Sequence, residues 1–234
     1  MAGNRRTQSS EPRPAARGGR PALISRERIL DAARQIPARE LTMPAVALRL
    51  GVSAPALYRH FDSRDALLAA LGAELSAEFK LIPANPQRWR EWLMDTTLAL
   101  YDFLADNPVI LAVSGWAHVA GMAQPMLEAA FDTLEGAGFS TVEATEIWGQ
   151  VSGQAYLRAR LLHDAPAYGD PEVLQAASRS AGSLGGNNAA RWQAYIDARG
   201  TTDPRELFVH SLRWLLSALP EPAPRKAARR KVRA

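Results

Sequence analysis

The stretch that decides the fold of this chain is residues 50–68, "LGVSAPALYRHFDSRDALL". Gly51 stands between two short runs with helical spacing, and a glycine just after a helix favours the left-handed conformation that turns the chain away. Leu57 and Phe61 lie four residues apart, so they share one face of a helix and should turn inward. Two short helices joined by about three residues around a glycine have the helix–turn–helix geometry. The stretch therefore predicts this motif.

The neighbouring residues place this stretch in a group of four helices. Polar residues that cap helix starts precede each apolar run, and prolines mark first turns or ends. We expect helices over about 25–36, 42–50, 53–61 and 63–79, capped by Ser25, Thr42, Ser53 and Ser63. The N–H groups at such helix starts suit phosphate oxygens.

The third of these helices should carry small and polar side chains on its outer face. They are Ala54, Pro55, Ala56, Tyr58, Arg59 and His60. Tyr58 and His60 can donate to phosphates, and Arg59 can reach a base edge or a phosphate. Small residues at the helix start would allow a close approach to a DNA groove. Taken alone, Tyr58 could equally be an aromatic ring that covers the helix corner.

The rest of the chain also has helical spacing and no alternating strand pattern. Breakers such as Asn107-Pro108 and Asp203-Pro204 divide it into further segments. We expect helices at about 86–106, 108–120, 124–136, 140–163, 171–180, 188–199 and 204–219. The sequence thus predicts an all-α protein, with a helix–turn–helix domain over 25–80 and a second helical domain over 81–219.

Composition excludes several classes of protein. The hydrophobic fraction of 47% is sufficient for a core. With no cysteines, disulfides and thiolate metal sites are excluded, and the chain fits a reducing cytoplasm. No apolar run reaches about 18 residues, so we expect no membrane-spanning helix. The four histidines lack metal-like spacing and no nucleophile–base pair stands out, so we expect no metal, no cofactor and no enzymatic activity.

Charge is distributed unevenly along the chain. Residues 1–28 hold seven arginines against two glutamates, and residues 225–234 hold six basic residues and no acid. Residues 81–220 instead hold nine basic and fifteen acidic residues. We expect residues 1–24 to be a disordered basic arm and residues 220–234 a disordered basic tail. A polyanion such as nucleic acid would bind such segments; an anionic membrane surface or a merely solubilising role would also account for them.

Residues 23–71 resemble the DNA-binding domain of TetR-family transcriptional regulators. The resemblance rests on "RERILDAA" at 27–34, "LTMPAVALRLGVSAPALYRHF" at 41–61 and "SRDALL" at 63–68. Within the family, the motif looks nearest to the branch named after the tetracycline repressor. The remainder of the chain resembles the family only in being helical and of suitable length.

The resemblance implies a set of DNA contacts. Thr42 would meet phosphate, Tyr58, His60 and Arg64 would hold the backbone, and the start of the third helix would enter the major groove. The whole set is Thr42, Ser53, Ala54, Pro55, Ala56, Tyr58, Arg59, His60 and Arg64, with Arg17 and Arg20 as arm residues. Double-stranded DNA is therefore the first expected partner.

A homodimer and a small-molecule effector are the other expected partners. The resemblance implies that two late helices of each chain form the dimer interface, with candidates Gly149, Gly153, Phe208, Leu212 and Leu215. Aromatic and methionine side chains suit a pocket for an apolar ligand of medium size. The pocket candidates are Trp92, Tyr101, Trp116, His118, Met122, Met126, Trp148 and Tyr156. Ordinary core packing is the alternative for both sets.

These observations together predict a DNA-binding transcriptional regulator. The specific expectation is a ligand-responsive repressor that binds a palindromic operator as a dimer and is released by a small apolar or aromatic ligand. A helical ligand-binding or scaffold protein with a non-functional helix–turn–helix is the alternative.

Overall fold

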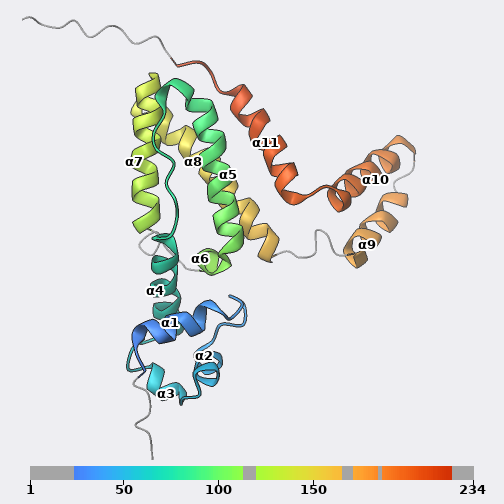
Figure 1. Cartoon of the computed structure of the whole chain (residues 1–234). Helices are drawn as coiled ribbons and strands as arrows, with labels where there is room; N and C mark the ends of the chain where they lie inside the picture. The colour runs from blue at the N-terminus through green and yellow to red at the C-terminus, as the bar shows by residue number, and fades with distance from the viewer. Residues whose placement is uncertain (1–23, 113–119, 165–170, 184–185, 223–234) are drawn as a thin grey trace, which may run out of the picture.

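The computed structural model describes residues 24–112, 120–164, 171–183 and 186–222. In these ranges the chain is helical and contains no strand, which confirms the expected all-α fold (Figure 1). The elements are α1 (Arg26–Arg34), α2 (Met43–Leu50), α3 (Ala54–Leu57), α4 (Arg64–Ser76), the 3-10 turn η1 (Pro86–Arg88), α5 (Trp89–Asp106), α6 (Pro108–Ala112), α7 (Ala120–Ala137), α8 (Thr141–Asp164), α9 (Pro171–Gly182), α10 (Gly186–Thr201) and α11 (Pro204–Ala218). None of these helices is long and apolar enough to cross a membrane.

Several helix boundaries differ from the expected ones for local reasons. The run 86–106 divides at Trp89, because Asn85 caps a 3-10 turn first. Helix α7 begins at Ala120, four residues before its expected start at about 124, and it continues through Pro125 without a break. The fourth helix ends at Ser76 rather than at Phe79. Most residues of the expected basic arm and tail lie outside the described ranges.

Helices α1–α3 form what we call the head, at one end of the molecule (Figure 1). The caps at Ser25, Thr42 and Ser63 are confirmed, since each side chain accepts a hydrogen bond from a backbone N–H in the first turn of its helix. Gly51 adopts φ 68° and ψ 34°, the left-handed conformation expected of it. Its N–H bonds back to Ala47 and Leu48, so the turn after α2 is sharp and closed.

Helices α5–α8 and α11 form what we call the body, and α4 connects it to the head (Figure 1). The long helices α5 and α8 make its principal contact. Ring pairs join its elements: Trp92 lies 5.9 Å from Trp148 between ring centroids, and Trp89 meets Phe139 edge-on at 4.9 Å. One buried hydrophobic cluster extends from α1 to α11, so head and body share a core.

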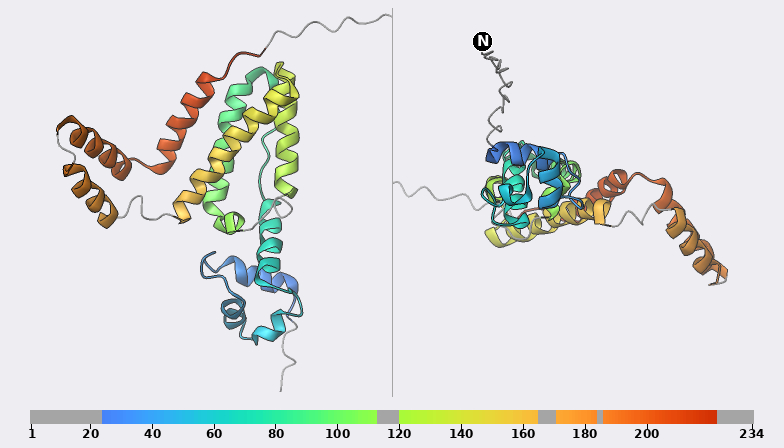
Figure 2. Two further views of the ribbon diagram at one scale, coloured as in Figure 1. Left: turned by 180° about the vertical axis from the view of Figure 1, so that it is seen from behind. Right: turned by 90° about the horizontal axis from the view of Figure 1, so that it is seen from below.

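Helices α9 and α10 pack mainly on each other and stand off from the body (Figure 1 and Figure 2). Trp192 and Tyr195 of α10 stack with their ring centroids 5.2 Å apart and remain 43% and 48% exposed. Ile196 is buried against its neighbours. This pair of helices therefore adds little to the body core.

The start of α8 has a capping box formed by Ser140 and Glu143. The N–H and hydroxyl of Ser140 donate to the Glu143 carboxylate at 2.7 and 2.8 Å, and the Glu143 N–H donates back to the hydroxyl. These donors lower the pKa of Glu143. The stabilisation is therefore present above the ordinary carboxyl pKa and is lost as pH falls through the lowered value.

We expect Ser140→Ala to lower the free energy of unfolding by about 1 kcal/mol, because it removes the cap of a long body helix. Thermal or urea unfolding at neutral pH measures the change. Thr145→Ala is the matched control, since its hydroxyl donates only to the Thr141 carbonyl within the same helix. An equal effect of both substitutions would contradict the capping role.

Candidate nucleic-acid interface

The turn between α2 and α3 determines which side chains the head presents to solvent. Helix α3 has only four residues and continues as a hydrogen-bonded turn, in which His60 and Phe61 donate to the Leu57 carbonyl. Leu57 and Phe61 are buried, at 0% and 2% exposure, as their spacing predicted. Residues 58–60 are consequently held between two anchored residues rather than on a long helix.

Three polar side chains project from this turn. Tyr58 is 50% exposed, Arg59 is exposed and His60 is half-buried. Neither the Tyr58 hydroxyl nor the Arg59 guanidinium has a hydrogen-bond or ion-pair partner among the described residues. Phosphate oxygens and base edges are the acceptors that such donors bind on DNA.

The helix starts beside these side chains are not equivalent. Thr42 is exposed, and its Oγ1 accepts from the Ala45 N–H at 3.2 Å, so the first turn of α2 is ordered at the surface. Ser53 is also exposed but makes no side-chain cap, which corrects the expectation for it. Its hydroxyl remains available, as do the exposed ring of Pro55 and the partly exposed methyl group of Ala54.

Two of the expected contact residues have structural roles. Ala56 is only 6% exposed, so its methyl group packs in the head and is not on the outer face. The Arg64 guanidinium donates from Nε to the Leu41 carbonyl at 2.6 Å and from Nη2 to the Ala38 carbonyl at 3.4 Å. Arg64 therefore joins the start of α4 to the loop between α1 and α2.

Sequence reasoning missed residues that hold or flank this surface. Nη1 of Arg26 donates to the His60 carbonyl at 3.2 Å, and its guanidinium lies 4.2 Å from the Phe61 ring centroid. Leu48 of α2 is 83% exposed. The helical spacing could have indicated this exposure, because Met43, Val46 and Ala47 form the buried face of α2 and Leu48 does not lie on that face. The long-range contact of Arg26 has no comparable signal.

The candidate pocket residues lie in the body core where they are described. The buried candidates are Trp92, Tyr101, Met122, Met126 and Trp148, whereas Tyr156 is 39% exposed. The Trp92 indole donates to the Ile82 carbonyl, and burial is the main cause that raises the pKa of Tyr101. Trp116 and His118, like Arg17 and Arg20 of the arm, lie outside the described residues.

The candidate dimer residues separate into two kinds. Phe208 and Leu212 are each 1% exposed, and the Phe208 ring lies 4.9 Å from that of Tyr101. Both pack inside their own protomer, so the expectation that they form an interface is wrong. Gly149 and Gly153 are exposed, and a Cβ at either would meet open space. Trp214, on the same helix as Phe208, is 72% exposed and was not among the candidates.

Comparison with known proteins agrees with this geometry. Residues 29–71 match the family model described as bacterial regulatory proteins, tetR family. An HTH-type transcriptional repressor of Mycobacterium tuberculosis is 29% identical over 178 residues, and an uncharacterized HTH-type transcriptional regulator of Mycobacterium bovis matches equally. The match covers 72% of this chain and spans 63% of the length of those relatives.

Solved structures share the fold at low identity. Apo ActR from Streptomyces coelicolor, a TetR family protein, superposes with a TM-score of 0.63 at 18% identity, covering 84% of this chain and 94% of that one. Its complex with actinorhodin gives 0.60 at 19% identity, covering 84% and 98%. A TetR variant from Acinetobacter baumannii in complex with minocycline gives 0.56 at 20% identity, covering 83% and 92%.

Fold and site together define a helix–turn–helix protein. The matched segment contains α2, the Gly51 turn and α3, which are the elements that form the candidate interface. Residues 29–71 are therefore similar to the segment that the family model of tetR-family bacterial regulatory proteins describes.

Proposed function

We propose that this chain is a ligand-responsive transcriptional repressor that binds operator DNA as a homodimer. The observation that carries the proposal is the exposed set Tyr58, Arg59 and Thr42 on one end of the molecule, where the first two have no partner among the described residues. Exposed donors at the end of a helix–turn–helix are positioned for phosphates and base edges.

Each side chain has a distinct proposed role. Arg59 reaches a base edge in the major groove or an adjacent phosphate, while Tyr58 and Thr42 hold the DNA backbone. Ala54 and Pro55 allow close approach, because neither carries a long side chain. With so few base-reading groups, sequence-dependent DNA shape contributes to operator choice. His60, fixed by the contact of Arg26 with its carbonyl, supports the same backbone contact.

Dimerisation would bring two heads onto one operator. A single short α3 covers too little DNA, and two-fold partners read half-sites about 34 Å apart. The interface that we propose uses the exposed side of α8, where Gly149 and Gly153 allow close helix approach, together with Trp214 and partly buried Leu215 of α11. In a two-fold symmetric dimer, each partner contributes this same surface to the interface.

The proposed effector is a small apolar or aromatic molecule bound in the body. The solved relatives include complexes with actinorhodin and minocycline, and the body of this chain holds tryptophans on α5 and α8. Helix α4 packs on α6 and α7 of the body and on α1 of the head, so movement at an effector site would reach the head through α4. Coupling of this kind is typically worth about 1–3 kcal/mol.

The test is binding of the full chain to DNA from upstream of its own coding region, measured by gel shift and fluorescence anisotropy. We expect a specific complex whose affinity decreases steeply as salt is raised, because counterions are released on phosphate contact. A scrambled fragment of equal length and composition is the control. Equal affinity for both fragments would refute the repressor and favour the alternative, a helical ligand-binding protein with a non-functional helix–turn–helix.

A further inference from the structure

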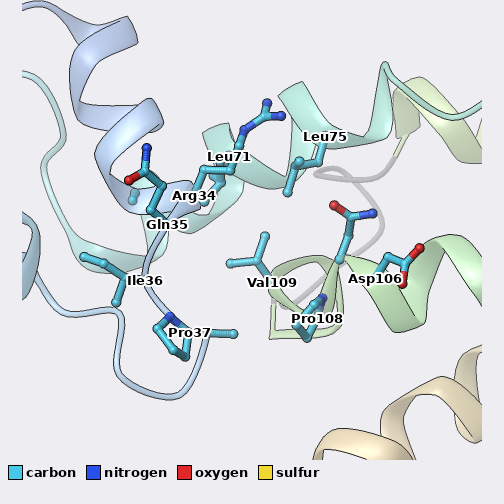
Figure 3. A pocket seen from close by; sticks show the side chains of 12 residues that line it. Arg34, Gln35, Ile36, Pro37, Leu71, Leu75, Asp106, Pro108 and Val109 are labelled. Carbon is cyan, nitrogen blue, oxygen red and sulfur yellow. The ribbon is translucent and has the colours of Figure 1, made fainter.

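A cavity of about 270 Å³ lies between the head and the body (Figure 3). Its walls come from three parts of the chain: residues 33–38 at the end of α1 and in the following loop, residues 71 and 75 of α4, and residues 106–109 where α5 passes into α6. None of the effector-pocket candidates of the body lines it. This cavity is therefore a separate space from the one expected for the effector.

The floor of the cavity is apolar. Figure 3 shows Leu71 and Leu75 of α4 on one side, facing Ile36, Pro37 and Val109. Both leucines are buried, at 0% and 5% exposure, and therefore belong to the shared core beneath the cavity. A floor of this kind favours a hydrocarbon or aromatic body.

The polar side chains of the lining differ in whether they are already bonded. Arg34 donates to Glu78 at 2.7 Å and to Glu74 at 3.1 Å. The Gln35 amide oxygen accepts from Arg49, and the Asn107 amide donates to the Phe103 carbonyl at 2.9 Å. These three groups are therefore used in joining neighbouring elements.

Asp106 is the exception among these polar groups. Its carboxylate is exposed, and no described residue forms a hydrogen bond or ion pair with it. It is also the last residue of α5, where the helix dipole adds partial negative charge rather than balancing it. A positive group at this position would gain from both the carboxylate and the helix end.

Other charged groups and a second helix end lie around the cavity. Helix α1 also ends at the cavity, at Arg34, so a second carboxyl-terminal helix end lies beside it. The one cation of the lining, Arg34, is paired with two glutamates. Arg49 donates to Gln35 and Arg64 donates to the Ala38 carbonyl, so these cations are also engaged by neighbouring residues. Asp106 is therefore the charged group of the lining without a described partner.

We propose that this cavity binds a small amphiphilic cation, an organic amine with one ring or a short hydrocarbon body. The ammonium group lies beside Asp106, and the apolar body lies on Leu71, Leu75 and Val109. Because one wall belongs to the head and another to the body, the bound amine fixes the angle between them. This last consequence rests on the proposed function, whereas binding of the amine does not.

The test uses three probes of one shape and different charge: 4-phenylbutylamine, 4-phenylbutanol and 4-phenylbutyrate. Binding to the full chain is measured by calorimetry and by amide chemical shifts, without DNA, so the result is independent of the repressor proposal. We expect the amine to bind about 10-fold more tightly than the alcohol and the carboxylate to bind least. The shifts should occur at Gln35, Ile36 and Val109.

Two variants locate the binding site. Asp106→Asn should reduce the amine's affinity to that of the alcohol and leave the alcohol's unchanged. Asp95→Asn, an exposed carboxylate of the same helix outside the cavity, should change neither. Ala38→Leu narrows the cavity from a partly exposed loop position and should weaken all three probes. Circular dichroism of each variant verifies that the fold is retained.

Several results would overturn the proposal. Equal affinity for the amine and the carboxylate would mean that the negative charge of Asp106 does not contribute to binding. Shifts confined to α5 and α8 would place the amine in the body instead. An unchanged affinity of the amine for Asp106→Asn would exclude that carboxylate as its partner.

Discussion

Arg59→Ala is expected to weaken operator binding by about 1–3 kcal/mol, which is roughly 5- to 150-fold. Arg59 is exposed and has no described partner, so its removal should cost the chain little stability. Anisotropy titrations with the operator, together with a thermal unfolding curve, separate the two effects. We expect the affinity to decrease while the melting temperature stays within experimental error.

The salt dependence of operator affinity, compared between Arg59→Ala and the unchanged chain, shows whether Arg59 binds a phosphate or a base. If Arg59 binds a phosphate, the slope of log affinity against log salt should decrease by about 1, and the loss should be similar for all sequences. If it binds a base edge, the loss should be greatest for one operator sequence. Arg88→Ala is the control of equal charge, since Arg88 pairs with Glu91 at the start of α5, the end of the body far from α3 (Figure 1). Equal losses for both variants would contradict an assignment of DNA contact to Arg59.

Leu57→Ala is expected to lower the free energy of unfolding by about 2–5 kcal/mol. Leu57 is fully buried at the end of α3, and its carbonyl accepts the bonds that close the turn over residues 58–60. The cavity left by the lost side chain lies directly beneath the candidate interface. Operator affinity should therefore decrease with stability, although Leu57 touches no DNA in our proposal.

Leu48→Ala is the matched control for this prediction. It deletes the same atoms nine positions earlier, from a side chain that is 83% exposed. Urea unfolding should show a change in the free energy of unfolding of less than about 0.5 kcal/mol, because the Leu48 side chain buries little apolar surface that the substitution could remove. A loss as large as that of Leu57→Ala would mean that burial in the head does not determine its stability.

Local signals in the sequence predicted the head well. The caps at Thr42 and Ser63 and the left-handed Gly51 depend on residues within four positions of one another, and all three are present. Leu57 and Phe61 are buried as their spacing indicated. Ser53 shows where this reasoning stops, because a helix of only four residues has no side-chain cap despite a suitable residue.

Residues that depend on distant neighbours were predicted less well. An apolar stripe on a late helix has the same sequence pattern whether its own protomer or a partner covers it. Phe208 and Leu212 were therefore assigned to an interface, whereas both are buried in the core of their own protomer. Arg64 was assigned to DNA from the family resemblance, and its bonds to Leu41 and Ala38 span more than twenty residues, so no local pattern indicated them. The cavity likewise joins three segments that lie far apart in the sequence, and no local spacing indicates it.

Helix α4 has a mechanical consequence for the head. Its 13 residues make an unbroken rod of about 20 Å that joins the head to the body. If one end of a rod of that length tilts by about 5°, the other end moves by about 1.7 Å. Hydrogen bonds to DNA tolerate only a few tenths of an ångström around their best length. If the chain is the repressor that we propose, a lever of this length would release the operator through a small rotation, with every helix of the head intact.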